Sequence, residues 1–212
     1  MNWYHIASIN PAELVAAKIT RQVFEQIKAG KEDFLFSTPD IPNVSVVSGY
    51  VLPLQPPHEN DPLNIRAAYY VHTNETNHIG ITINVPQDFG PEYYSQLYAE
   101  LQTAIRHEIE HSTESREKII EEGAQAWQRN RPTPEAAEKY LTSLLELPAN
   151  VAGMYYQAKK TKKPFIEVLD NWIAAWKKIY ARYPSEILTE IFDRVRKKLL
   201  NYARKRYPKA QL

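Results

Sequence analysis

The sequence predicts an α+β fold in which a small antiparallel or mixed sheet is followed by a helical half. Between about residues 33 and 86, short segments rich in β-branched and aromatic residues alternate with turn-forming clusters such as TPDIPN and QPPHENDP. From residue 91 onward, apolar residues instead recur at helical spacing. Strands first and helices afterwards is an order typical of α+β proteins.

Length and composition favour one globular domain. The chain has 212 residues, of which 43% are hydrophobic and 24% charged. We expect a single domain over residues 1–212, with a helix and the sheet in 1–90 and the helices of a candidate active site in 91–160. Residues 161–212 would then form a helical C-terminal extension.

The first helix is predicted to follow SINPAEL, because Ser8 or Asn10 can cap it and Pro11 suits its first turn. Gly30 is expected to end it. The clearest strand is HIGITINVP, residues 78–85 before Pro86. Its isoleucines and valine alternate with His78, Gly80, Thr82 and Asn84, so we expect one buried face.

The helical half begins at PEYY, with Pro91 in a first turn. A polar segment over residues 112–134 is interpreted either as a cover over a site or as a plain connection. The next helical region, over residues 134–160, is expected to be interrupted or bent near Pro148. Two amphipathic helices separated by Pro184 complete the chain.

The composition limits the chemistry. The chain has no cysteine, so thiolate metal sites, cysteine nucleophiles and disulfides are excluded. Any transition metal would need His, Asp or Glu ligands. The net charge of +1 gives no overall bias towards nucleic acid, and we expect no membrane partner because no segment approaches 18 uninterrupted apolar residues. The N-terminus lacks the pattern of a signal peptide.

One motif carries candidate chemistry, RHEIEH at residues 106–111. On a helix, His107 and His111 lie one turn apart on the same face and can share one zinc ion. Glu108 is placed to take a proton from a water that the metal activates. The alternative interpretation is a solvated helical face, because both histidines and the nearby glutamates can also lie in water.

The order of strand 78–85, short link and HEIEH helix resembles the core of zincin metallopeptidases. That resemblance implies that 78–85 is an edge strand along the cleft, where Gly80, Thr82 and Asn84 would lie beside an extended polypeptide substrate. The sequence lacks the third histidine and the glycine of metzincins. It is nearer to gluzincins, in which a glutamate on a later helix completes the zinc site.

Glu146 is the candidate for that third ligand. It lies in a mostly apolar helical segment, where a lone carboxylate is costly to bury unless it is paired or bound to metal. The alternative is a carboxylate at the boundary of an amphipathic helix. Asn150, one turn later, can accept a hydrogen bond from a metal-bound histidine and orient its ring.

The stretch YLTSLLELPANVAGMYYQAKKTKKPF, together with RHEIEH, resembles small predicted metallopeptidases of tailed bacteriophages and bacteria. The resemblance covers roughly residues 78–166 and implies one zinc ion held by His107, His111 and Glu146. It departs at Pro148, where that group often has a second acidic residue. It also implies a cytoplasmic location in a bacterial host cell, or association with a virion.

Zincins often stabilise the developing oxyanion with a Tyr or His. Tyr140, Tyr155 and Tyr156 are candidates by their closeness in sequence to Glu146, although most of the 14 tyrosines must serve packing.

The C-terminal helices are basic, with KKTKK and DRVRKKLLNYARKR. These charges are interpreted as the solvated faces of packed helices, or alternatively as contacts to phosphates or to an acidic partner. A non-catalytic zincin-like protein, structural or regulatory, whose basic helices bind a partner is therefore the alternative to a peptidase.

Overall fold

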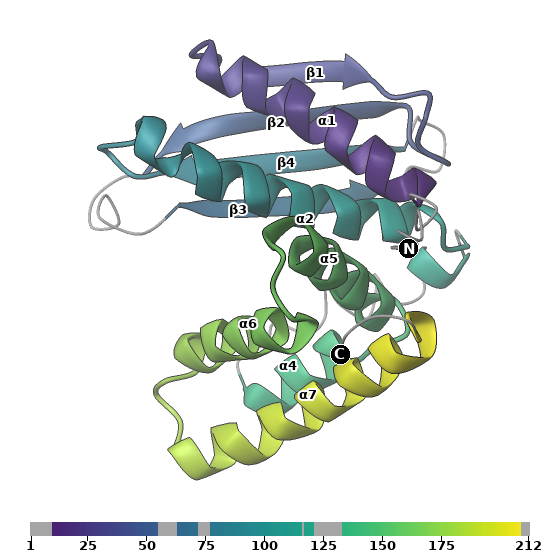
Figure 1. Cartoon of the computed structure of the whole chain (residues 1–212), viewed down its shortest axis with the longest axis vertical. Helices are drawn as coiled ribbons and strands as arrows, with labels where there is room; N and C mark the ends of the chain where they lie inside the picture. The colour runs from purple at the N-terminus through teal and green to yellow at the C-terminus, as the bar shows by residue number, and fades with distance from the viewer. Residues whose placement is uncertain (1–9, 55–62, 72–76, 116, 121–132, 209–212) are drawn as a thin grey trace, which may run out of the picture. The chain divides into compact units, whose positions relative to one another are not determined.

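The computed structural model is drawn in Figure 1. It describes residues 10–54, 63–71, 77–115, 117–120 and 133–208. The chain forms two compact units, residues 1–113 and 114–212, where the sequence predicted a single domain. The first unit contains the sheet and the described part of the second is helical, so the predicted α+β class is confirmed.

The first unit has two long helices and four strands (Figure 1). Its elements are α1 Pro11–Lys28, β1 Asp33–Ser37, β2 Val46–Pro53, β3 Asn64–Tyr70, β4 His78–Val85, the short 3-10 helix η1 Pro91–Tyr93, and α2 Tyr94–Ser112. The strand order is β1-β2-β4-β3. The β2 and β4 strands are parallel, and the other two neighbouring pairs are antiparallel. The sheet is therefore mixed.

The boundaries of α1 follow the predicted signals. The side chain of Asn10 accepts a hydrogen bond from the Ala12 N–H at 3.0 Å, and Pro11 occupies the first turn. Gly30, just beyond the helix, has a φ of 74°. That left-handed conformation favours glycine, which explains why the chain turns there.

The predicted strand 78–85 forms with these bounds, and its residues alternate between buried and half-buried. The prediction that it is an edge strand is wrong, because β4 lies between β2 and β3 and pairs with both. Alternation reports which face of a strand is buried, and carries no information about which of its backbone edges are paired. Gly80, Thr82 and Asn84 therefore do not lie on a free edge.

Helices α1 and α2 lie on the same face of the sheet and pack against each other (Figure 1). The core between these helices and the sheet is aliphatic, with its main members fully buried: Ile19, Val23, Val47, Ile79, Ile81, Ile83, Leu97, Leu101 and Ile105. Helix α2 also packs against β3. The RHEIEH helix is therefore fixed along one side by apolar burial, which leaves its remaining sides for polar groups.

The second unit contains four described helices around one core. They are α4 Pro134–Leu141, α5 Glu146–Thr161, α6 Phe165–Ile179 and α7 Ser185–Arg206. The predicted interruption of this helical region lies between α4 and α5, at residues 142–145, and Pro148 itself is inside α5. Pro148 is the third residue of α5, where a backbone N–H has no partner within the helix, so proline is tolerated there.

Several basic residues of α7 pair with acids of the same unit. Arg194 contacts Glu138 and Glu190, and Arg196 contacts Asp170. Apolar residues of α7 such as Phe192 and Val195 are fully buried. This arrangement favours the interpretation of α7 as a packed helix with a solvated face. Across the described residues, no helix is long and apolar enough to cross a membrane.

Candidate metal centre

The C-terminal half of α2 carries the histidine pair. The Nε2 atoms of His107 and His111 are 3.0 Å apart, and their rings meet edge to face with centroids separated by 4.7 Å. Both side chains are partly exposed. The spacing of four residues on a helix brings two ring nitrogens to one point, as the sequence predicted.

This separation is close to what a shared metal ion requires. Zinc binds histidine nitrogen at about 2.0–2.1 Å, so two nitrogens on one tetrahedral zinc lie about 3.3 Å apart. Two neutral imidazoles at this distance have one other option, in which one ring donates a hydrogen bond to the other. The donor set therefore fits a borderline-soft cation such as zinc.

Glu108 lies beside the pair but is far less exposed than the histidines. It is 5% exposed, and its Oε1 is 3.9 Å from Nε2 of His107. Withdrawing a carboxylate from water is costly unless charge or hydrogen bonds compensate. A cation held by the two histidines would lie close to this carboxylate, which would then be near any water on that cation.

A second ionisable pair on α2 was not anticipated from the sequence. Arg106 is 2% exposed, and its Nη2 donates to the Glu110 carboxylate at 2.8 Å. Its Nη1 is buried without a hydrogen-bond partner among the described residues. The spacing of four residues within RHEIEH was the available signal, because Arg and Glu at that distance pair on a helix. The motif thus contains two i, i+4 pairs, one of opposite charges and one of two metal-binding rings.

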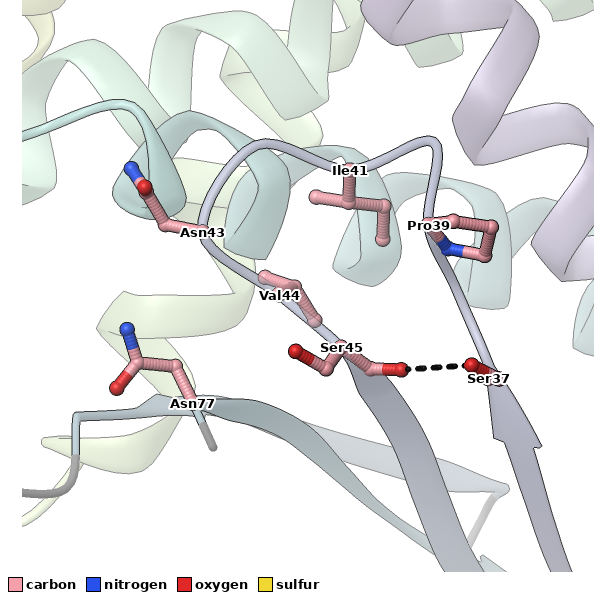
Figure 2. A pocket seen from close by; sticks show the side chains of 7 residues that line it. All are labelled: Ser37, Pro39, Ile41, Asn43, Val44, Ser45 and Asn77. Atoms are coloured by element: carbon pink, nitrogen blue, oxygen red, sulfur yellow. Dashed lines mark hydrogen bonds between the residues drawn. The ribbon is translucent and has the colours of Figure 1, made fainter. Parts of the chain in front are cut away.

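The loop between β1 and β2 holds the end of α2. Asn43 donates from Nδ2 to the Ser112 carbonyl at 2.8 Å, and has a φ of 59°. The Tyr69 hydroxyl on β3 donates to the Asn43 carbonyl at 3.2 Å. Asn43 also lines a shallow pocket with Asn77 and uncharged neighbours (Figure 2). The pocket has no ionisable side chain. Because Asn43 holds the Ser112 carbonyl, we assign the loop a positioning role for the turn of α2 that carries His111.

The other predicted site residues belong to the second unit. Glu146 is the first residue of α5, partly exposed, and its N–H donates to the Ser143 hydroxyl at 3.2 Å. Asn150 is 9% exposed, and its buried Nδ2 has no hydrogen-bond partner among the described residues. The two lie one turn apart on α5, as expected, and their use together with the histidine pair is part of the proposal below.

Two of the three candidate tyrosines, Tyr140 and Tyr155, are partly buried against the core of the second unit. The Tyr155 ring stacks on Tyr207 at 3.9 Å between centroids. Tyr156 is 1% exposed. Packing accounts for Tyr155, and the oxyanion role of Tyr140, Tyr155 or Tyr156 stays a prediction.

The fold and the motif together define a class of site, a His-x-x-x-His pair with an adjacent buried glutamate on a helix packed against a mixed sheet. Comparison with known proteins adds no relative, since no family model, no curated protein and no solved structure matches the chain. The residues of this chain therefore carry the functional argument.

Proposed function

We propose that the protein is a zinc-dependent metallopeptidase. The observation that carries the proposal is the 3.0 Å separation of the His107 and His111 Nε2 atoms, with the buried Glu108 carboxylate beside them. Two facing ring nitrogens next to a carboxylate form the arrangement that hydrolytic zinc sites use.

Glu146 is proposed as the third ligand. Each of His107, His111 and Glu146 offers one ligand atom, two ring nitrogens and a carboxylate oxygen. Three protein ligands leave the fourth position of a tetrahedral zinc open, which is the pattern of catalytic rather than structural sites. Asn150, on the same helix one turn later, would accept a hydrogen bond from a ligating histidine through its Oδ1 and orient that ring.

Bound zinc would supply a Lewis acid and a water that ionises near neutral pH. Glu108 would take the proton of that water as general base and then deliver it to the leaving amine. Its burial serves this role, because a carboxylate removed from bulk water interacts more strongly with a nearby cation.

The strand that we propose to pair with the substrate is β3 and no longer β4. Among the described strands, β3 pairs only with β4, and α2 packs against it. An extended polypeptide can add to such an edge through backbone hydrogen bonds, which gives affinity with little demand on side chains. We therefore propose that residues 64–70 line the peptide, in place of Gly80, Thr82 and Asn84.

Metal content and hydrolysis test the proposal separately. Purified protein is expected to bind one zinc per chain by elemental analysis, and to cleave fluorescein-labelled casein or a mixed peptide digest. His111→Ala and Glu146→Ala should lose zinc, whereas Glu135→Ala, an exposed glutamate in the first turn of α4, should retain it. Zinc binding unchanged in Glu146→Ala would remove Glu146 from the site.

The variant Glu108→Gln tests whether Glu108 is the general base. It should retain zinc and lose cleavage by about 10²–10⁴-fold. Glu100→Gln is the matched control, because Glu100 is on the same helix, accepts a hydrogen bond from Gln96 and already has a pKa raised by burial. A Glu108→Gln protein that cleaves at the wild-type rate would show that Glu108 is not the general base. Wild type that binds zinc but cleaves none of these probes would favour the structural or regulatory alternative.

A further inference from the structure

The sheet of the first unit has one face that α1 and α2 do not cover, here called the open face. Its residues follow from the strand register. They are Asp33, Leu35 and Ser37 on β1, Val46, Ser48, Tyr50 and Leu52 on β2, His78, Gly80, Thr82 and Asn84 on β4, and Asn64, Arg66, Ala68 and Tyr70 on β3. Exposed apolar side chains on one face of a sheet indicate an interaction surface when they are contiguous.

Exposed apolar side chains are unequally divided between the two halves of this face. On the β1 and β2 half, Leu35 is 74% exposed and Tyr50 is 60% exposed, and on the β3 and β4 half Tyr70 is 47% exposed. The Tyr70 ring stacks on His78 and lies over Gly80. The register places Ala68 at the level of Leu35 and the smaller Thr82 at the level of Tyr50.

The charges of the open face are also divided between its two halves. Asp33 and Arg66 belong to one row, Asp33–Tyr50–Thr82–Arg66, and occupy its two ends. Both are exposed. Three strand spacings separate them, about 14 Å, so they are too far apart to pair within one chain.

We propose that the open face binds the open face of a second copy of this chain. A two-fold axis parallel to the strands, passing between β2 and β4, places β1 of one protomer over β3 of its partner. Each Asp33 then faces an Arg66, which gives two ion pairs per dimer. Leu35 lies over Ala68, and Tyr50 lies over the smaller Thr82.

Self-association explains this pattern better than an unrelated partner does. One operation pairs both Asp33 side chains with Arg66 side chains, as expected of an isologous interface, in which one patch must be complementary to itself. Two aligned sheets packed face to face at about 10 Å are a common arrangement. The proposed zinc ligands lie on helices, but Arg66 and Ala68 belong to the β3 strand that is proposed to line the peptide, so the dimer is tested by its mass and not by cleavage.

Sedimentation equilibrium of the full chain tests the inference, with Asp33→Lys, Arg66→Glu and the double charge swap. Wild type is expected to dimerise, and each single substitution should weaken the dimer about tenfold or more, because it places like charges together at both symmetric contacts. The double variant should return to within a few-fold of wild type. Arg21→Glu, an exposed charge change on α1, is the matched control and should leave the dimer unchanged.

Each other outcome overturns the proposal. A wild type that stays monomeric up to ~100 μM has no such interface. A dimer that neither single substitution weakens uses another surface. Single variants that weaken the dimer without recovery in the double variant would show that Asp33 and Arg66 do not face each other. Circular dichroism of every variant confirms that the fold is retained.

Discussion

The ion pairs of the helical unit differ in kind from the histidine pair on α2 of the first unit. In the helical unit, acids meet bases: Glu138 accepts hydrogen bonds from Arg194 and Lys198, and Asp170 accepts from Arg196. Each such group compensates its neighbour, and the result is a modest contribution to stability. Nothing further is needed to explain why these side chains are close together.

On α2 of the first unit, two groups of the same kind meet instead. Two imidazole Nε2 atoms lie 3.0 Å apart, and the carboxylate of Glu108 is buried close to one of them. One ring can donate a hydrogen bond to the other, and the same placement suits the cation that we propose they share. The contrast is between charges that compensate each other and a pair of rings that we propose to bind a metal.

The largest effect expected from this contrast is on metal affinity. His111→Ala should weaken zinc binding by more than about a hundredfold, because it removes a direct ligand. Competition titration against a chromogenic chelator measures the change. His78→Ala on β4 is the control histidine, and it should leave zinc affinity unchanged. Equal losses in the two variants would show that the helical pair has no special role.

A core substitution in the helical unit should instead lower the stability of the fold. Phe192 is 0% exposed at the centre of that unit, so Phe192→Ala should lower the free energy of unfolding by about 3–5 kcal/mol through cavity formation. Urea unfolding measures this change. Ile187→Ala, on the same helix at a position that is 40% exposed, should cost much less. Comparable losses for both would contradict the packing described for α7.

The sequence predicted the features that depend on local chemistry. Asn10, Pro11 and Gly30 bound α1 because capping and left-handed φ are properties of a few neighbouring residues. The meeting of His107 with His111 likewise needs only helical spacing. Such features were correct because no distant part of the chain decides them.

The features that the sequence predicted wrongly or missed are strand pairing and contacts between segments, which depend on distant parts of the chain. Strand β4 has the alternation expected of a half-buried strand, yet its neighbours are chosen by the topology of the whole sheet. The interruption expected near Pro148 lies in the residues just before Glu146, because a helix tolerates proline in its first turn. The hydrogen bond from Asn43 to the Ser112 carbonyl, here called the clamp, joins residues 69 positions apart, so no local pattern indicated it.

A smaller effect is expected at the ion pairs of the helical unit. The Arg194 guanidinium lowers the pKa of Glu138 below its ordinary value of 4.5. The folded state therefore binds this proton less readily than the unfolded state. The resulting stabilisation is present above pH 4.5 and is lost as the pH falls through the lower folded pKa. Glu138→Gln should cost about 1 kcal/mol at pH 7 and flatten the stability profile between that pKa and pH 4.5.

Urea unfolding of Glu138→Gln from pH 3 to 7 measures this dependence. Glu190→Gln is the control, because its contact with Arg194 involves a carboxylate that is 77% exposed and should count for less. If Glu138→Gln and wild type lose stability in parallel over this range, the Glu138 pair does not contribute to acid sensitivity.

The smallest effect concerns the clamp on the turn that carries His111. Asn43→Gly removes the hydrogen bond to the Ser112 carbonyl but keeps a residue suited to the φ of 59°, so it should cost about 0.5–1.5 kcal/mol. Asn43→Ala should cost about 1 kcal/mol more, because it adds strain in the left-handed region. Amide hydrogen exchange at residues 109–113 should accelerate in both variants.

If the clamp also fixes the ring of His111, zinc affinity should fall severalfold in Asn43→Gly although no ligand has changed. A variant with faster exchange and unaltered zinc affinity would confine Asn43 to stabilising the helix end. The first unit would then position its histidines through apolar packing of α2 alone, and the loop would be dispensable for the metal centre.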